Sequence, residues 1–166
     1  MIVAGLIIAI RTMNTRRGDK IAFVTLDDRS GRIELAVFSE AYQRYQDMLS
    51  KDKLIVVEGE VSVDDYSGGY KMSARSIYDI EQARAHFAKR LKVHVNQERA
   101  SNGFIPALQH ILQPFCQGAC PVVIDYQSDD ARVDLPLGQD WQVHPSDELL
   151  HRLRELTGEQ DVEIIY

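Results

Sequence analysis

The sequence predicts an all-β barrel of five strands, with one helix between the third and fourth strands, followed by a small α+β domain. The first observation is a pair of apolar segments within residues 20–38, on either side of the polar turn Asp28-Arg29-Ser30-Gly31. The second is an apolar strand before this pair and two more strands after it. The third is a change to helical spacing near residue 80. We therefore expect two domains, residues 1–80 and residues 81–166.

The first domain begins with a strand over residues 2–12, which is rich in Ile, Val and Leu. This composition is typical of a strand that is buried over much of both faces. Gly5 predicts a bulge or a bend within it, which small barrels need for closure. The turn at residues 28–31 suits a hairpin, because Gly31 tolerates a positive φ and Asp and Ser side chains bond to nearby backbone groups.

After the third strand, Ser39 is a good N-cap for a short helix. The apolar residues of that helix have helical spacing: Ala41, Tyr42, Tyr45, Met48 and Leu49. A fourth strand at residues 55–63 and a fifth at residues 70–79 follow, with Met72 and Ala74 facing the core. Five strands with a helix in this position is the order of the oligonucleotide/oligosaccharide-binding barrel, or OB-fold, whose face and loops commonly bind nucleic acid.

The second domain has alternating helical and strand patterns. In chain order we expect a helix from residue 80, a strand at 91–95, a helix at 104–115, a hairpin of 121–127 and 131–137, a short strand at 141–143, a helix that starts at 145–148, and a closing strand at 162–166. These elements predict a small α+β unit.

The charge of the chain limits its contacts with nucleic acid. Its net charge of −6 argues against a general coating of DNA, so any contact has to come from a local basic patch. Residues 1–80 hold 11 Lys and Arg against 12 Asp and Glu, whereas residues 81–166 hold 8 against 13. This asymmetry suits a nucleic-acid module followed by a module that contacts protein. No apolar run is long enough to cross a bilayer, and we expect a cytoplasmic protein.

Residues that could carry catalysis are scarce. The paired carboxylates at 27–28, 64–65 and 129–130 all lie beside Gly or Ser in predicted turns, where Asp is favoured for backbone reasons. The five His residues fall singly, and no nucleophile triad or phosphate-binding loop is visible. Cys116 and Cys120 lack further metal ligands at suitable spacing, so we expect two reduced thiols. This segment is therefore predicted to have no catalytic residue, metal or cofactor.

A basic loop between the first two strands is the best candidate for contact with nucleic acid. Residues 11–20 hold four cations against one acidic side chain, and such a loop contacts phosphates without base specificity. Outward-facing aromatic residues beside it would stack on unpaired bases. The candidate nucleic-acid-binding residues are Arg11, Arg16, Arg17, Lys20, Phe23, Phe38, Tyr70, Lys71 and Arg75. The alternative is a loop that is only solvated, and a Phe23 that lies in the core.

The acidic second domain contains the only tryptophan, Trp141. A place in the core is one interpretation. The other is an anchor for a protein partner, because Trp is enriched at interface hot spots. On the second interpretation, Trp141 and Val143 are the candidate partner-binding residues.

Short motifs along nearly the whole chain carry a family resemblance. In the first domain they are Val3-Ala4-Gly5-Leu6, Arg17-Gly18, the run from Thr25 to Arg32, Phe38, Tyr45-Gln46, Val61-Ser62, Asp64-Asp65, Ser67-Gly68-Gly69 and Lys71-Met72. In the second they are Glu81, Ala83-Arg84, the run from Val143 to Asp147, Leu149-Leu150 and Leu153-Arg154. In this order they resemble the C-terminal region of the bacterial replicative DNA polymerase III alpha subunit.

This resemblance implies a division of labour. The barrel would bind the single-stranded template, with the basic loop touching phosphates, and the last domain would dock the tau subunit of the clamp loader. The polymerase carboxylates of the family would lie upstream of this segment. The family's extreme C-terminus is associated with weak contact to the sliding clamp; here the tail Gln160–Tyr166 has a Gln and a terminal aromatic at loose spacing.

Two alternatives stay open. The first strands are also similar to the anticodon-binding barrel of class II aminoacyl-tRNA synthetases, which has a comparable Asp-Arg-Ser-Gly turn. The third possibility is a protein-interaction module whose barrel has no contact with nucleic acid. A phosphate contact should weaken steeply as the salt concentration rises, which would distinguish this last possibility.

Overall fold

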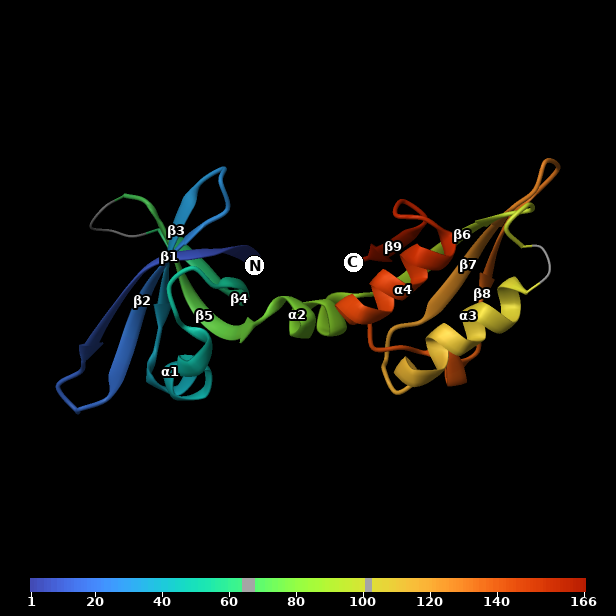
Figure 1. Cartoon of the computed structure of the whole chain (residues 1–166). Coiled ribbons are helices and arrows are strands. Elements are labelled where there is room, and N and C mark those ends of the chain that lie inside the picture. The colour runs from blue at the N-terminus through green and yellow to red at the C-terminus, as the bar shows by residue number, and fades with distance from the viewer. Residues whose placement is uncertain (64–67, 101–102) are drawn as a thin grey trace. The chain divides into compact units, whose positions relative to one another are not determined.

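A computed structural model describes residues 1–63, 68–100 and 103–166. The chain forms two compact units, Met1–Ile80 and Glu81–Tyr166, which are described separately (Figure 1). Within the described ranges, no helix is long and apolar enough to cross a membrane.

The first unit is a closed barrel of five strands. They are β1 (Ile2–Asn14), β2 (Lys20–Asp27), β3 (Arg32–Val37), β4 (Leu54–Val63) and β5 (Tyr70–Tyr78). Their order around the barrel is β1-β2-β3-β5-β4, in which only β3 and β5 are parallel neighbours. Helix α1 (Ser39–Tyr45) and a 3₁₀ turn (Gln46–Met48) connect β3 to β4. The predicted OB-fold, with five strands and a helix between the third and fourth, is therefore confirmed.

Strand β1 closes the barrel because it pairs along both of its edges. Its first part, Ile2–Leu6, pairs with β4, and its longer second part, from Leu6 to Asn14, pairs with β2. The pairing with β2 shifts register between Ile7 and Ala9, so the bulge lies three residues beyond the predicted position at Gly5. Gly5 instead marks a close approach of β1 to β2, since a Cβ there would lie 3.1 Å from the carbonyl oxygen of Asp27.

A second irregularity lies between β4 and β5. The register shifts between Glu58 and Gly59, which brings the backbone of Gly59 against that of Ser73. A Cβ on Gly59 would lie 2.1 Å from the carbonyl oxygen of Ser73, so only glycine fits here without a movement of the backbone. Bulges of this kind bend a strand and let a small barrel close.

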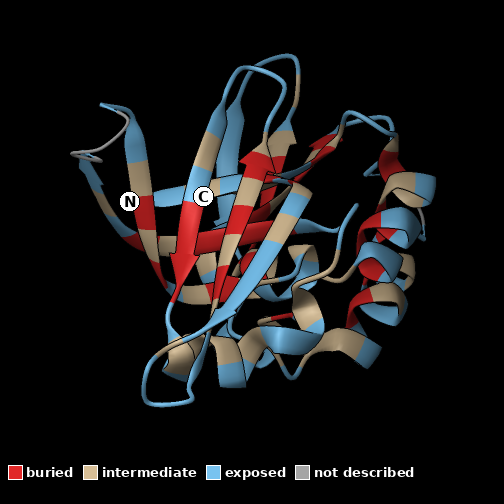
Figure 2. Cartoon of the chain, turned by 90° about the vertical axis from the view of Figure 1, so that its left-hand side faces the viewer, coloured by how far each residue is buried: buried red, intermediate tan, exposed pale blue. Residues whose placement is uncertain are grey.

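The core of the barrel is made of alternate side chains from all five strands. Buried and exposed residues alternate along much of the strands (Figure 2). The buried set is Ile7, Ala22, Val24, Leu26, Leu35, Val37, Ile55, Val57, Met72, Ala74 and Ile77. Met72 and Ala74 face inward, as predicted, and the apolar residues of α1 and the 3₁₀ turn pack against this core.

Two local predictions in this unit are wrong. In the β2–β3 turn the residue with positive φ is Arg29, at 72°, and not Gly31. The Asp28 carboxylate orders the turn, as predicted, because it accepts hydrogen bonds from the backbone N–H groups of Ser30 and Gly31 at 2.9 Å each. Ser39 is the first residue of α1 rather than its N-cap; Phe38 holds that position, and no side chain caps the helix.

The second unit consists of a four-stranded sheet and of helices, two of which pack on one face of the sheet. The strands are β6 (Arg90–Asn96), β7 (Val122–Gln127), β8 (Arg132–Pro136) and β9 (Val162–Ile165), and their order is β8-β7-β6-β9. The helices are α2 (Ile80–Phe87), α3 (Phe104–Leu112) and α4 (Asp147–Thr157), with 3₁₀ turns at Gln113–Phe115 and Gln139–Trp141. The predicted α+β unit is confirmed, although residues 141–143 contribute only one bridge, between Val143 and Cys120, instead of a strand.

One continuous apolar core joins this sheet to α3 and α4. Its members are Leu91, Val93, Val95, Phe104, Leu108, Leu112, Cys120, Val122, Ile124, Val143, Leu149, Leu150, Leu153 and Val162. Ser146 caps α4 by accepting a hydrogen bond from the backbone N–H of Leu149 at 3.2 Å. Alternate residues of β6 and β7 point to the other face of the sheet, away from this core.

That other face carries a charged network centred on Asp125, whose side chain is 1% exposed. Arg132 donates to both of its carboxylate oxygens, at 2.9 and 2.5 Å. Lys92 lies 3.4 Å away, and Nδ1 of His94 lies 2.8 Å away. Hydrogen bonds from Arg132 and then from Lys92 hold the pKa of Asp125 well below its ordinary value, although burial acts in the opposite direction.

Replacing Gly59 with Ala should destabilise the barrel by roughly 2 kcal/mol, because the added methyl group overlaps the Ser73 carbonyl oxygen. Urea unfolding followed by far-UV circular dichroism measures this loss. Fluorescence of Trp141, which lies in the second unit, should change little. The control is Gly31→Ala, because nothing lies within 4 Å of a Cβ at that position. Equal stability of the two variants would contradict the account of the bulge.

Asp125 should make the second unit sensitive to acid. A carboxylate whose pKa is lower in the folded state stabilises the fold above its unfolded pKa, about 4, and this contribution is lost as the pH falls below that value. Asp125→Asn should lower stability at neutral pH by roughly 2 kcal/mol and flatten the acid dependence. Urea titrations of Trp141 fluorescence at neutral and acidic pH test this. The exposed Asp130→Asn serves as control; an unchanged acid profile in Asp125→Asn would refute the assignment.

Candidate nucleic-acid interface

The loop between β1 and β2 projects beyond the barrel and is ordered by Thr15. The backbone N–H of Thr15 donates to the carbonyl oxygen of Asp19 at 2.7 Å, and the N–H of Gly18 donates to that of Thr15 at 3.0 Å. The Thr15 hydroxyl accepts from the N–H groups of Arg17 and Asp19. Gly18 has a φ of 87°, which favours glycine at the tip. The loop therefore has a defined shape, although all its cationic side chains are exposed.

Three of the predicted phosphate-binding cations lie in this loop or at its junction with β2. Arg16, Arg17 and Lys20 are exposed, and in the described part of the chain their side chains have no ion pair and no hydrogen bond. Their charge is therefore available to a ligand. Two free guanidinium groups and one ammonium on a single loop form a compact site for the phosphates of a backbone.

Arg11 and Phe23 extend this cationic region onto the outer face of the barrel. Arg11 pairs with Phe23 in the β1–β2 register, and its guanidinium carbon lies 5.1 Å from the centroid of the ring. Phe23 is half-buried on the outer face, between the inward-facing Ala22 and Val24. The alternative place for Phe23, in the core, is thus not the one observed. The ring offers an aromatic surface that already holds one cation.

Phe38 and Tyr70 are the most accessible aromatic candidates, with 54% and 72% of their surface exposed. Phe38 follows the last residue of β3, and Phe23 on β2 pairs with Ala36, two residues before it. Phe38 and Phe23 are therefore diagonal neighbours across the two strands, on the outer side. Tyr70 begins β5, which is the neighbour of β3 on the other side.

The two candidates on β5 differ from the loop cations. Lys71 is half-buried and takes part in interactions of its own. Arg75 is exposed but forms an ion pair with Glu60 of β4, with 2.6 Å between Nη2 and Oε1. Glu60 is not among the residues that the sequence predicts for this interface. The bulge at Gly59 places Glu60 opposite Ser73, and no sequence pattern signals that register.

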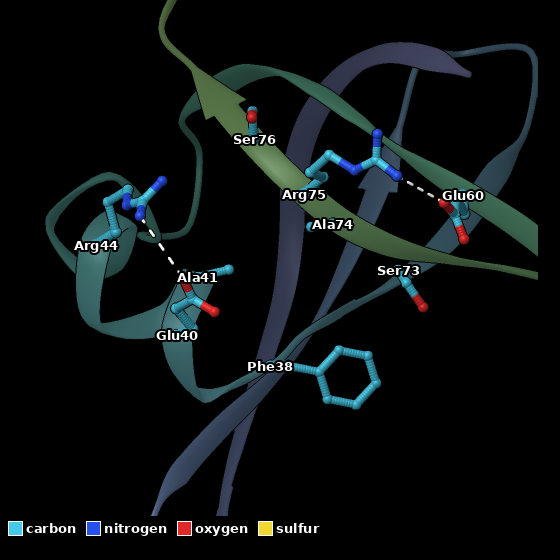
Figure 3. A pocket seen from close by; sticks show the side chains of 9 residues that line it. All are labelled: Phe38, Glu40, Ala41, Arg44, Glu60, Ser73, Ala74, Arg75 and Ser76. Carbon is cyan, nitrogen blue, oxygen red and sulfur yellow. Dashed lines mark hydrogen bonds and ion pairs between the residues drawn. The ribbon is translucent and has the colours of Figure 1, made fainter.

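A hollow of about 410 Å³ lies between α1 and β5, and Phe38, Ser73 and Arg75 are among its lining residues (Figure 3). Its complete lining is Phe38, Glu40, Ala41, Arg44, Glu60, Ser73, Ala74, Arg75 and Ser76. Each of its two arginines has a glutamate partner. Arg75 pairs with Glu60, and Arg44 lies 3.8 Å from Glu40. The hollow therefore has no net charge, in contrast to the loop.

In the second unit, the two candidate partner-binding residues have different surroundings. Trp141 is half-buried and packs against the apolar core, so part of its surface remains accessible. Val143 is fully buried, and its carbonyl group would lie 2.0 Å from a Cβ on Gly118. The side chain of Val143 therefore belongs to the core and offers no surface to a partner. The terminal tail is also constrained, because Val162–Ile165 pairs with β6 as β9.

The remaining candidate groups have structural roles. Asp27 and Asp28 accept hydrogen bonds within their own turn, chiefly from Arg32 and Ser30, and these bonds lower the pKa of both carboxyls. The carboxylate pair at residues 64–65 lies outside the described residues. Cys120 is buried and Cys116 half-buried, both as free thiols whose pKa burial raises. Across the described ranges, no group of three or more His, Cys, Asp or Glu side chains is placed to hold a metal ion.

Comparison with known proteins agrees with this architecture. Residues 1–80 match the family model of the OB-fold nucleic acid binding domain, and residues 107–158 match that of the DNA polymerase III subunit alpha, C-terminal domain. DNA polymerase III subunit alpha of Vibrio cholerae is 49% identical over 162 residues, or 98% of this chain. The chain is homologous to the C-terminal region of the DNA polymerase III alpha subunit. The corresponding proteins of Escherichia coli K12 and Pseudomonas aeruginosa are 44% and 42% identical over 97% and 99% of the chain.

The chain spans 14% of the length of these alpha subunits. The alignment runs through both the barrel and the second unit, so the two units together form the matched alpha-subunit region. Among solved structures, the SSB domain of a Synechococcus protein is 12% identical and has a TM-score of 0.42. That match covers 47% of this chain and 91% of the other.

Proposed function

We propose that this alpha-subunit segment binds single-stranded DNA through its barrel, close to where the complete polymerase handles its template. The observation that supports this function is a group of three cations in and beside the β1–β2 loop, which form no ion pair in the described part of the chain and lie next to the outward-facing rings of Phe23 on β2 and Phe38 just after β3. The cations would contact phosphates, and the rings would stack on bases. On this proposal catalysis belongs to parts of the alpha subunit outside this segment.

Single-stranded DNA fits this surface better than duplex DNA for two reasons. Aromatic stacking needs base faces that are not already stacked in a helix, and Phe38 is more than half exposed. The chain also has a net charge of −6, so it lacks the broad positive field that holds a duplex without sequence preference. We therefore expect weak binding that depends on one loop and a few rings.

Replacing Arg16, Arg17 and Lys20 together with Ala should weaken binding of oligo-dT by about tenfold or more at low salt, because up to three phosphate contacts are lost. It should also reduce the slope of log affinity against log salt by up to about 2 units. Fluorescence anisotropy of a labelled oligonucleotide, measured over a series of salt concentrations, gives both values.

The matched control is a second triple variant, with Lys51→Ala, Lys89→Ala and Arg90→Ala combined. It removes the same charge from exposed positions outside the loop. An equal loss of affinity in both triple variants would show that only net charge matters. Competition with duplex DNA and with a tRNA hairpin tests the remaining alternatives. Tighter binding of the hairpin than of oligo-dT would favour the anticodon-binding interpretation.

We also propose that the second unit docks the tau subunit of the clamp loader. Supporting observations are the accessible part of Trp141 and two exposed apolar side chains of β8, Val133 and Leu135. By register, Val133 lies opposite Tyr126 and Leu135 opposite Ile124, on the face of the sheet that forms the core. These side chains thus continue the apolar face out to an edge strand, where a partner could bury them.

Trp141→Ala and, separately, Leu135→Asp should each weaken tau binding about tenfold or more, with little change in oligonucleotide binding. Calorimetry with purified tau measures the affinity. Leu135 is exposed, so its replacement reports on the surface even if Trp141→Ala disturbs the core. The matched control is Val63→Asp, an exposed apolar position in the barrel. Full tau binding by the folded Leu135→Asp protein would exclude β8 from the interface.

A further inference from the structure

The hollow between α1 and β5 differs chemically from the loop that carries the proposed phosphate contacts. Its charged residues form two pairs, Arg75 with Glu60 and Arg44 with Glu40, and so cancel. A phosphate that entered the hollow would contact an arginine, but a carboxylate lies next to each of the two arginines and would repel the phosphate. The hollow is therefore a poor site for the backbone of DNA.

The same hollow suits a neutral, planar group with donors and acceptors on its edge. Phe38 offers an exposed ring along one side, and Ser73 and Ser76 add hydroxyl groups that donate and accept (Figure 3). The cavity volume of about 410 Å³ is in the range of small-ligand sites. A nucleobase has both features, a π-face for stacking and a polar edge for hydrogen bonds.

We propose that this hollow holds one unpaired base of the bound strand, stacked on Phe38, and that Glu60 and Arg75 recognise the edge of that base. The inference depends on the proposed single-strand binding and adds a base-reading site to it. The carboxylate of Glu60 accepts from an exocyclic amine, and the guanidinium of Arg75 donates to the ring nitrogen or carbonyl beside it. Both groups are exposed, so the ion pair can open to admit the base without a movement of the fold.

This arrangement distinguishes cytosine from thymine. Cytosine has an amine next to an acceptor nitrogen, which satisfies Glu60 and Arg75 together. Thymine has a carbonyl in place of the amine, which would face the carboxylate of Glu60 without a proton between them. Glu60 is thus the residue that determines specificity, and Phe38 supplies stacking that is common to both bases.

The test compares oligo-dC and oligo-dT of equal length with the whole chain, by anisotropy at mildly alkaline pH where oligo-dC stays unstructured. The wild type should bind oligo-dC about fivefold more tightly. Glu60→Ala should abolish this preference, whereas Phe38→Leu should weaken both oligonucleotides by about fivefold and keep it. Neither substitution should lower the salt dependence, because neither removes a phosphate contact.

Glu98→Ala is the matched control for charge, since Glu98 is an exposed carboxylate of the other unit. If Glu60→Ala strengthens both oligonucleotides equally and steepens the salt dependence, the hollow binds phosphate and the inference is wrong. It is also wrong if the wild type shows no preference. Failure of the proposed function looks different: the wild type would then bind neither oligonucleotide, or the triple loop variant would bind both as well as the wild type does.

Discussion

The double pairing of β1 is the constraint on which the rest of the barrel depends. One strand of 13 residues has to pair with β4 over its first five residues and with β2 over the remainder. The change of partner requires the backbone of β1 to pass close to β2 at Gly5 and to bulge at Ile8. Because the part paired with β2 continues to Asn14, the hairpin extends past the barrel and carries its loop into solvent. The position of the cationic loop is thus a consequence of closure.

The positive charge that this barrel offers to a ligand depends on which cations are paired with carboxylates, as much as on composition. The barrel half of the sequence is nearly neutral, yet its cations have different partners. Arg75 is matched by Glu60 and Arg32 by Asp27, whereas Arg16 and Arg17 at the loop form no ion pair with any described residue. A surface potential that is weak on average can therefore be strong at one loop. This local excess makes single-strand binding by an acidic protein physically reasonable.

Much of the fold could be predicted because periodicity reports burial directly. Alternation in the strands identified Met72 and Ala74 as core residues. The register between β4 and β5 could not be predicted, because a bulge depends on how the backbones of two strands meet, and the alternation within one strand does not show this. Glu60 was missed for this reason. Val143 was wrongly predicted to contact a partner, because a segment of three residues has too few positions to show which side faces the core.

In the second unit, the charged face of the sheet is poorly suited to binding a protein partner, whereas the apolar side of β8 is better suited to it. Lys92, Arg132 and Asp134 surround Asp125 and pair with it or with each other, so a partner binding here would have to break ion pairs before forming its own contacts. A partner that binds the opposite, apolar side of β8 does not have to break these ion pairs. Pro136 lacks a backbone N–H, which limits strand addition at the outer edge of β8. Docking through side chains is therefore better suited to this edge than extension of the sheet by a partner's strand.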